Sequence, residues 1–367
     1  MSAWGRVKKL LLLLLVLLHL SMWVVLSKHF SFFHSASRFI DFDAYYKLAQ
    51  DIRMRLDPYT VVDMQTLGPP LMILPFVPFS FLPLHVGSFI FFLLNLAAGY
   101  MLCWLLSEAV FPQNWKGVGT LFLSLLFFLF FPTRFGLVLG QVDVFVALLC
   151  TLLLVQKQQQ LLIVWLTVIL KSLFVFLFIP LFLKSKRKVL FTIFNLVCIA
   201  CTFLYIRPQW YMSYLRSTFS STLIANQPIA RLDYYNQSIK STVHRTEIPQ
   251  LYPWVLLLLV PCFLFFTSKQ STEGLIIVSL LVSPVVWQHY FTILFPIFVM
   301  LWTKVSWRSR IVLLICALSC AISVDYFNLA QPTFIRGVFA SHGTWALLIL
   351  VAIIVIHLRS AHLHDMQ

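Results

Sequence analysis

The sequence predicts an all-α polytopic membrane protein, folded as one integral membrane domain over residues 1–367. Of its 367 residues, 60% are hydrophobic and only 11% are charged, whereas a soluble domain carries about 25% charged residues. The mean hydropathy is +0.91. Apolar runs close to the ~20 residues that cross the hydrocarbon layer recur along the whole chain. A chain with so few polar groups cannot cover its surface in water, so a soluble enzyme is excluded.

The first apolar run, 10–27, is expected to remain as an uncleaved membrane span. It follows three basic residues and so resembles a signal peptide. It is long, however, and the nearest small-x-small stretch, at 35–37, lies too far beyond it for cleavage. About twelve membrane segments are expected in all, at 10–27, 86–107, 117–133, 136–155, 160–170, 172–183, 188–206, 251–267, 274–287, 289–303, 311–325 and 344–358.

The basic residues predict the orientation, because short loops rich in lysine and arginine stay in the cytoplasm. We expect the protein in an inner or plasma membrane with its N-terminus on the cytoplasmic side, and an even number of segments then places the C-terminus on that side too. The same order places these basic residues inside: Lys157, the 184–188 cluster, Lys269, Lys304, Arg308, Arg310 and Arg359. Residues 69–84 must then not cross, and their five prolines remove too many backbone donors for a regular helix in lipid. The net charge of +15 is spread over these loops, so no nucleic-acid partner is expected.

Two long connections then face outward, at 28–85 and 207–250. In the first, apolar residues recur at helical spacing: Tyr45, Leu48, Ala49, Ile52 and Leu56. This pattern predicts an amphipathic helix that lies on the outer membrane face. The helix is expected to end at Asp57-Pro58, because the residue before a proline avoids the helical conformation.

Asp41 and Asp43 stand at the start of this helix, and their positions allow three interpretations. Asp41 can cap the helix N-terminus by accepting backbone donors. Asp43 can complement the helix dipole. Alternatively, one of the two carboxylates does chemistry. An Asp-x-Asp pair is common, so the spacing alone favours the cap.

Polar residues mark three further helix ends on the outward side. Arg134 and Asp143 flank one of them, and a structural ion pair would explain both residues. Lys171 interrupts an apolar stretch, where a charge at mid-membrane costs about 2.5–3.5 kcal/mol unless its side chain reaches the interface. His289 lies at a third break, where a lone histidine is ordinarily structural.

The second outward loop holds Asn236-Gln237-Ser238 and Arg245 among further cations. Five cations and two acids suit an anionic ligand such as a lipid phosphate, although headgroup contact without specificity explains them equally well. The topology places five charged or titratable residues near one outer interface: Asp41, Arg134, Lys171, Arg245 and His289. One shared cavity explains this convergence better than five separate structural roles.

In order along residues 1–300, these positions resemble the polyprenol-phosphate-mannose-dependent mannosyltransferases, glycosyltransferase family 87, within the GT-C superfamily. The matching segments are Asp41-Phe42-Asp43-Ala44-Tyr45-Tyr46, Asp57-Pro58-Tyr59, the proline-rich run from Pro69 to Pro83, Gly140-Gln141-Val142-Asp143, Lys171, Asn236-Gln237-Ser238 with Arg245, and Ser283-Pro284-Val285-Val286-Trp287-Gln288-His289. Three positions depart from the family pattern. Asp143 stands where asparagine is usual, Tyr290 where a second histidine is common, and Gly68 where an aromatic residue precedes the prolines.

The resemblance implies a GT-C fold and an inverting membrane hexosyltransferase. The expected donor is a polyprenyl-phosphate sugar, with mannose as the first candidate, and the expected acceptor is a lipid-linked or cell-envelope glycan at the outer face. Asp41 aligns with the family's loop aspartate and is the expected base, with Asp43 as the fallback. The residues expected to meet the donor phosphate are Arg245, Lys171, His289 and Arg134. Substrate contacts are expected from Tyr45, Tyr46, Tyr59, Gln141, Asp143, Asn236, Gln237 and Trp287.

No metal or other cofactor is expected. The Asp41-x-Asp43 pair resembles the metal-binding pair of nucleotide-sugar enzymes, but nucleotide sugars are not expected outside the membrane. All seven cysteines lie inside apolar segments, without histidine or acid at metal-ligand spacing, and are expected to be small core residues.

Two other functional classes remain open at this point, as does a purely structural membrane protein in which the loop acids are dispensable. An O-antigen polymerase or ligase also presents a large outward loop with arginine and histidine, but does not need the early aspartates or the proline run. A transporter or channel would carry polar residues along its helices at mid-depth, whereas here they gather at helix ends on one side.

Overall fold

The computed structural model describes residues 3–27, 39–59, 68–156, 160–184, 206–218, 236–323 and 334–365, with five single positions between 189 and 203. Within these residues every element is helical, apart from one isolated bridge between Asn236 and Trp287. The predicted all-α class is therefore confirmed. Most of the expected segment 188–206 lies outside the described residues.

Four described helices are long and apolar enough to cross a membrane. They are α1 (Ala3–Ser27), α4 (Leu84–Val110), α14 (Tyr252–Lys269) and α19 (His342–Asp365). A fifth crossing is possible through α5 (Lys116–Leu129) and α6 (Phe131–Leu139), which meet at a bend of 67°. Other apolar helices are shorter: α7 (Asp143–Val155), α8 (Gln160–Leu170), α9 (Val175–Lys184), α15 (Thr272–Val282), α16 (Leu294–Lys304) and α17 (Trp307–Ala321). The number of twelve segments thus stays a prediction.

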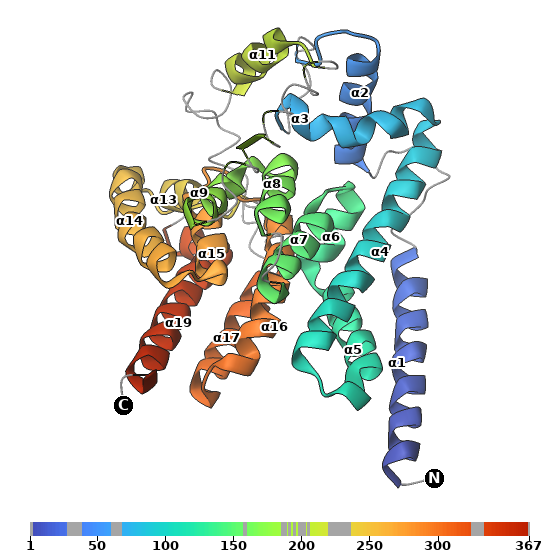
Figure 1. Cartoon of the computed structure of the whole chain (residues 1–367), viewed down its shortest axis with the longest axis vertical. Helices are drawn as coiled ribbons and strands as arrows, with labels where there is room; N and C mark the ends of the chain where they lie inside the picture. The colour runs from blue at the N-terminus through green and yellow to red at the C-terminus, as the bar shows by residue number, and fades with distance from the viewer. Residues whose placement is uncertain are drawn as a thin grey trace.

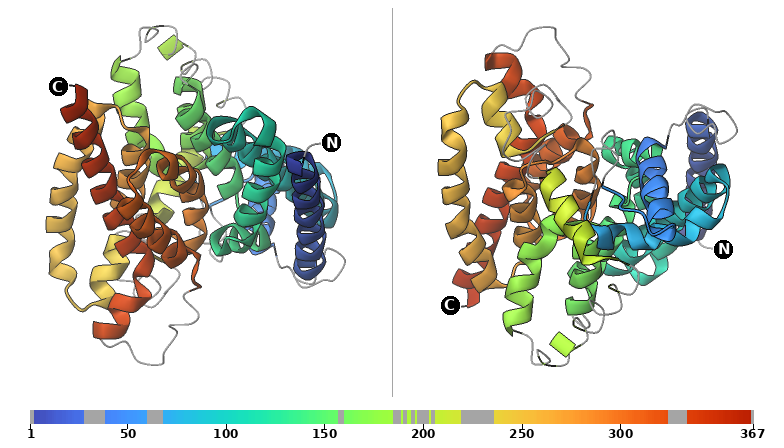
Figure 2. Two further views of the ribbon diagram at one scale, coloured as in Figure 1. Left: turned by 90° about the horizontal axis from the view of Figure 1, so that it is seen from below. Right: turned by 90° about the horizontal axis from the view of Figure 1, so that it is seen from above.

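The helices form two groups with a polar end in common. In Figure 1, α1, α4 and α5 stand on one side, while α14, α15, α17 and α19 stand on the other. Figure 2 shows the same division from above and below, with α7 and α8 between the groups. The chain termini lie at one end of the molecule, whereas α2 (Ile40–Arg53), α3 (Pro70–Ile73) and α11 (Pro208–Thr218) lie at the opposite end.

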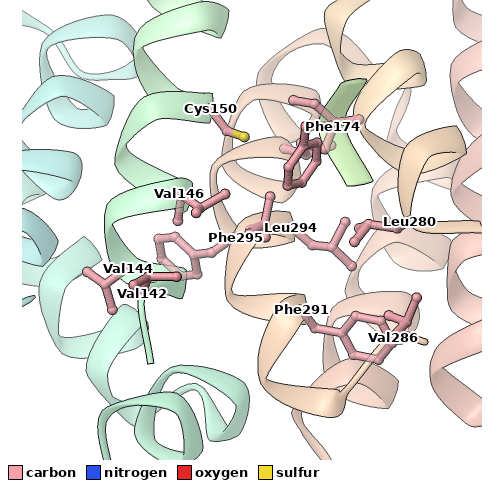
Figure 3. Close-up of a cluster of buried hydrophobic side chains, with 14 of the residues drawn as sticks. Val142, Val144, Val146, Cys150, Phe174, Leu280, Val286, Phe291, Leu294 and Phe295 are labelled. Carbon is pink, nitrogen blue, oxygen red and sulfur yellow. The ribbon is translucent and has the colours of Figure 1, made fainter. Parts of the chain in front are cut away.

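The core between the two groups is built from aliphatic and aromatic side chains. Figure 3 shows Val144, Val146 and Cys150 on α7 beside Leu294 and Phe295 on α16, with the Phe295 ring reaching toward α7. The side chains of all five residues are buried. This packing fixes α7 against α16, and so fixes the polar residues at the beginning of α7 relative to those before α16.

The predicted amphipathic helix in the first loop is present as α2, but its apolar face packs on protein. Phe42 is fully buried and its ring lies 6.1 Å from that of Phe76 and 5.0 Å from that of Phe91. Tyr45 stacks on Phe76 at 4.5 Å. These partners come from the 3-10 helix η1 (Leu74–Phe81) and from α4. The apolar face of α2 therefore packs on the aromatic surface that the proline-rich segment and α4 supply, and the position of α2 on the outer membrane face stays a prediction.

The end of α2 also differs from the prediction. The helix stops at Arg53, with Arg55 at a φ of 60° rather than with Asp57-Pro58. Leu56 N–H donates to the Asp51 carbonyl and Arg55 N–H to the Ile52 carbonyl, at 2.9 and 3.1 Å. This pattern is a Schellman motif, which satisfies the last carbonyls of the helix. The helix therefore ends before it reaches the proline. Leu56 consequently lies outside the apolar face and is exposed.

The proline-rich stretch runs across the end of the molecule in Figure 1 as α3 and η1. At helical rises its twelve residues span about 22 Å, short of the ~30 Å hydrocarbon layer. Pro75 falls in the first turn of η1, where a missing donor costs nothing, whereas Pro78 lies inside this 3-10 helix. The stretch therefore serves as the platform on which α2 rests.

Three helix breaks lie within or between predicted membrane segments, and the break at Lys171 falls between the predicted segments 160–170 and 172–183. The expected segment 136–155 is wrong as one unit, because α6 ends at Gly140, whose φ of 75° is left-handed, and α7 begins only at Asp143. Lys171 has extended backbone between α8 and the 3-10 helix η3 (Ser172–Phe174). Residues 283–287 are irregular between α15 and the 3-10 helix η6 (Gln288–Ile293).

Replacing Gly140 by alanine should lower the free energy of unfolding by about 2 kcal/mol or more. The left-handed conformation disfavours a side chain by about 1–2 kcal/mol. A Cβ atom would also lie 2.7 Å from Phe42 Cβ. Unfolding of the purified protein in detergent, followed by circular dichroism, measures the change.

Gly117→Ala is the matched control, because a Cβ there meets nothing within 4 Å and the residue is in helix α5. We expect it to be neutral or slightly stabilising. Equal effects of the two substitutions would show that the close approach of α2 to residue 140 is wrong.

Candidate active site

The helix breaks and the first turn of α2 bring two polar groups of side chains together. The first group is Asp41, Tyr45 and Gln141. The second is Asp143, Lys171, His289 and Tyr290. Helix α6 packs on both η6 and α2, so the two groups share one region. In hydrocarbon, irregular backbone is stable only where protein buries it or where it lines a cavity.

Asp41 is the second residue of α2 and does not cap the helix. Phe39 holds the N-cap position, and no side chain there accepts a hydrogen bond from the first turn. The predicted cap was therefore wrong. Gln141 Nε2 instead donates a hydrogen bond of 2.6 Å to Asp41 Oδ2. The Asp41 carboxylate is thus directed toward the break between α6 and α7.

Gln141 is itself held by Tyr45. The Tyr45 hydroxyl donates to Gln141 Oε1 at 3.2 Å. An amide that accepts through its oxygen must present its NH₂ group elsewhere, and here it presents that group to Asp41. Because the Tyr45 ring is buried and stacked on Phe76, the orientation of the amide is set by the platform. Gln141 therefore orients one carboxylate oxygen of Asp41.

The environment of Asp41 makes it a stronger base than an exposed aspartate. Burial raises the pKa of the Asp41 carboxyl, while the hydrogen bond from Gln141 and the positive charge of Lys171 oppose the rise. A carboxylate with a raised pKa holds an abstracted proton more firmly near neutral pH. Such a shift at a buried acid beside a specific cation is common at functional sites.

Asp143 and Lys171 form a buried ion pair. Lys171 Nζ lies 2.6 Å from Asp143 Oδ1, and the two side chains are only 5% and 1% exposed. The ammonium also lies over the Tyr290 ring, 3.0 Å from its centroid. The Asp143–Lys171 ion pair contradicts the structural explanations that the sequence suggested for these two residues. Lys171 does not reach for the interface, and Asp143 pairs with it rather than with Arg134.

His289 completes the second group without a hydrogen bond. Its Nε2 lies 3.6 Å from Asp143 Oδ2, too far for a hydrogen bond. Its ring meets the edges of Phe135 and Tyr290, with centroids 5.7 and 4.9 Å apart. Neither ring nitrogen of His289 has a hydrogen-bond partner, and Asp143 Oδ2 has none either. The group is therefore buried but only partly satisfied.

Two other predicted residues, Asp43 and Arg134, form no hydrogen bond or ion pair with either polar group. Asp43 forms an ion pair of 2.9 Å with Lys47, one turn along α2. Asp43 is thus paired with Lys47, whereas Asp41 is bonded to Gln141, and Asp43 Oδ1 is enclosed without a hydrogen-bond partner. Arg134 on α6 is half-buried, and its Nε atom is enclosed without a hydrogen-bond partner.

Arg245 lies in another polar cluster, where its guanidinium is bound by protein. Nη1 donates to the Asn236 carbonyl and to Ser241 Oγ, both at 2.7 Å. Nε and Nη2 donate to Ser341 Oγ at 3.2 and 2.9 Å. These bonds connect α13 (Ile239–Arg245) to the beginning of α19. The predicted role of Arg245 at a phosphate stays a prediction.

The remaining residues of that loop also hold the backbone in place. Asn236 Oδ1 accepts from the Val286 N–H at 3.0 Å, and Asn236 bridges to Trp287. Gln237 donates to the Ala340 carbonyl and accepts from the Gly343 N–H, at 2.8 and 3.1 Å. The strand-like contact ends two residues before His289 and so positions η6.

Two predicted tyrosines bind backbone carbonyls in the first loop. The Tyr46 hydroxyl donates to Leu82 at 2.7 Å, and the Tyr59 hydroxyl donates to Gly68 at 2.9 Å. Both bonds join α2 and its following turn to the proline-rich platform. Their substrate contacts stay predictions, since these hydroxyls already serve the fold.

Tyr290 and Gly140 matter more to the site than the sequence indicated. Tyr290 presents its ring to Lys171, although in the sequence it stood out only as a departure beside His289. Gly140 lets Phe42 approach the turn that carries Gln141. A glycine directly before a polar residue between two apolar runs is the signal for such a turn.

No cluster of three or more metal-ligating side chains occurs among the described residues. The Asp143 carboxylate is paired with Lys171, and the charge of Lys171 also acts on the Asp41 carboxyl and the His289 imidazole. A cation there would face the charge of Lys171.

Comparison with known proteins gives one match. The model of glycosyltransferase family 87 matches residues 67–284, more than half of the chain. The matched region includes Gln141, Asp143, Lys171 and Arg245, while Asp41 and His289 lie outside it. Neither a curated protein nor a solved structure shows significant similarity.

Lys171→Met should lower the free energy of unfolding by about 3–5 kcal/mol, because it leaves the Asp143 carboxylate buried without its partner. The double variant Lys171→Met/Asp143→Leu should recover much of this loss, since it removes both charges. Denaturant unfolding in detergent micelles measures all three proteins.

Lys304→Met is the control, because Lys304 pairs with Glu273 at 2.8 Å but is 39% exposed. Its loss should be at most about 1 kcal/mol. A Lys171→Met effect no larger than that of Lys304→Met would contradict a buried pair.

Proposed function

Because the chain belongs to glycosyltransferase family 87, we propose that it transfers a hexose, with mannose as the first candidate, from a polyprenyl-phosphate sugar to a lipid-linked or cell-envelope glycan. The family and the apolar helices make it a membrane glycosyltransferase. The donor class, the sugar, the acceptor and the side of the membrane belong to the proposal.

The observation that carries the proposal is the Asp41 carboxylate, held by Gln141 beside a buried cation. Transfer to a hydroxyl requires a base for the hydroxyl proton. It also requires positive charge where the phosphate leaves, because that group gains negative charge in the transition state. Asp41 and Lys171 supply these two properties, and the charge of Lys171 acts on the Asp41 carboxyl.

The proposed reaction is a single displacement. The acceptor oxygen attacks the anomeric carbon while Asp41 takes its proton. The bond from that carbon to the phosphate oxygen breaks, and the polyprenyl phosphate leaves with the electron pair. Attack from the face opposite the leaving group inverts the anomeric configuration. Gln141 acts as a positioning residue, since it touches Asp41 rather than the substrate.

The donor phosphate is proposed to bind beside Lys171 and His289. Lys171 is the cation of the site, and the unsatisfied nitrogens of His289 can donate one further hydrogen bond. Arg134, on the adjacent α6, is a further candidate because its Nε is enclosed without an acceptor. The Trp287 side chain, half-buried just before η6, is proposed to contact sugar or lipid.

The site is proposed to face the outer side of the membrane. The basic residues Lys8, Lys116 and Arg359 come from α1, α5 and α19, whose ends lie with the chain termini in Figure 1. Short basic segments favour the cytoplasm. The opposite end, with α2 and α3, then lies outside, where lipid-linked rather than nucleotide-linked sugars are the available donors.

Asp41→Asn should reduce transfer at least about 100-fold, because general-base catalysis contributes roughly 10²–10⁴. The assay offers the purified protein a panel of radiolabelled polyprenyl-phosphate hexoses together with a membrane lipid extract. Donor binding should be retained, because the amide keeps the shape of the carboxylate.

Asp43→Asn is the matched control, since its carboxylate pairs with Lys47. It should change transfer only a few-fold. If Asp43→Asn is the inactive variant, the base is Asp43. If no polyprenyl-phosphate hexose supports transfer by the wild type, the proposed donor class is wrong.

The acid side of the pH profile should move to higher pH in Gln141→Leu. Asp41 must be ionised to accept a proton, so kcat/KM falls as the pH drops through its pKa. The bond from Gln141 lowers that pKa, and its removal raises it. Gln288→Leu, which removes a buried glutamine outside the Asp41 group, should leave the position of this limb unchanged. The same limb in Gln141→Leu as in wild type would exclude an ionised Asp41 as the titrating base.

A further inference from the structure

In the buried pair of Asp143 and Lys171, the Asp143 carboxylate occupies the position on Lys171 where the proposed donor phosphate would bind. Asp143 is the first residue of α7, where the helix N-terminus favours negative charge. Its Oδ1 lies 2.6 Å from Lys171 Nζ. A helix N-terminus with one lysine is also an arrangement suited to a phosphate. In this chain the protein's own carboxylate fills it.

The polar atoms beside this pair are buried without partners. Asp143 Oδ2 and both nitrogens of His289 accept or donate no hydrogen bond, and both side chains are at least nine-tenths buried. Buried polar atoms are nearly always paired in folded proteins. Three such atoms in one cluster indicate that a ligand binds there during the protein's function.

The charges around Asp143 disfavour a further anion. Five titratable side chains act on it or lie beside it: Lys171, His289, Tyr290, Asp41 and Tyr45. Among them a single ammonium balances two carboxylates. A phosphate added to this group would make three anions around one cation, in a region from which water is largely excluded. Loss of the charge on one carboxylate offsets this excess of negative charge and so favours binding of the phosphate.

We propose that the Asp143 carboxylate substitutes for the donor phosphate on Lys171, and that binding of the donor displaces it as Asp143 takes up one proton from solvent. This rests on the proposed lipid-phosphate donor. The ammonium of Lys171 then passes from carboxylate to phosphate, and no covalent bond breaks. Protonated Asp143 can donate its new O–H to the phosphate or to a sugar oxygen. Asp41 stays ionised, so it can still take the proton of the acceptor hydroxyl.

Donor affinity should therefore depend on pH with a defined sign. At high pH Asp143 must be protonated before the donor binds, so the dissociation constant rises with pH. The donor is a phosphodiester and keeps one negative charge throughout, so its own titration does not contribute. Asp143→Asn carries the neutral form permanently and should bind the donor more tightly, with little dependence on pH.

Isothermal titration of the full-length protein in lipid nanodiscs tests this, with polyprenyl-phosphate hexoses as probes, no acceptor, and about pH 5 to pH 9. For the wild type we expect up to a tenfold rise in the dissociation constant per pH unit at the alkaline end. Buffers of different ionisation enthalpy should reveal uptake of about one proton per donor. Asp143→Asn should bind at least tenfold more tightly at the highest pH and take up no proton. Lys171→Met should lose at least 100-fold in affinity.

Glu273→Gln is the matched control, because it also converts an ion-paired acid to its amide, at the pair with Lys304. It should bind like the wild type. The proton count needs only the wild type, so it decides the matter even if Asp143→Asn does not fold. Binding without proton uptake, or a wild-type pH slope in Asp143→Asn, would overturn the proposal and leave the proposed function intact. No binding of any polyprenyl-phosphate hexose at any pH would overturn both.

Discussion

Backbone amides inside a membrane need hydrogen-bond partners within the protein, and this constraint determines where the chain can carry its polar chemistry. A helix that stops within an apolar segment exposes its last carbonyls and the next N–H groups. Here α6 stops at Gly140, α8 stops before Lys171, and α15 stops before Ser283. Packing of α6 on η6 and of α7 on α8 brings these interruptions together. Polar side chains gather there because the irregular backbone already requires a protein-lined interior.

The first loop contributes the remaining part of the site by resting on an aromatic platform. Phe42 and Tyr45 bury their rings against η1 and α4, which fixes the first turn of α2 in place. Asp41 lies on that turn and meets Gln141 from the interrupted α6–α7 segment. Gly140 lies directly before Gln141 with a φ of 75°, and a Cβ atom there would lie 2.7 Å from Phe42 Cβ. Loop and helix breaks are therefore parts of one structure, and neither forms the site alone.

The sequence was sufficient to predict the all-α membrane class and the family. Hydropathy gives the class because it depends on composition, and the ordered motifs give the family. Partners were harder to predict, because contacts such as Asp143 with Lys171 depend on how distant helices pack. The cap at Asp41 and the helix end at Asp57-Pro58 failed for a related reason. Local rules assigned Asp41 to its own helix N-terminus and the end of the helix to the proline. In the structure Asp41 instead accepts a hydrogen bond from Gln141, and a Schellman motif at Arg55 ends the helix earlier.

In the proposed site the donor phosphate binds where the helix breaks converge, and Asp41 remains free to serve the acceptor. A cryo-electron microscopy structure with a non-transferable phosphonate analogue of a polyprenyl-phosphate hexose tests this arrangement most directly. We expect a phosphonate oxygen at about 2.7–2.9 Å from Lys171 Nζ. We also expect the Asp143 carboxyl displaced from that nitrogen, and Asp41 on the opposite side of the anomeric carbon. A phosphonate bound at Arg245, with the Asp143–Lys171 pair unchanged, would contradict this arrangement.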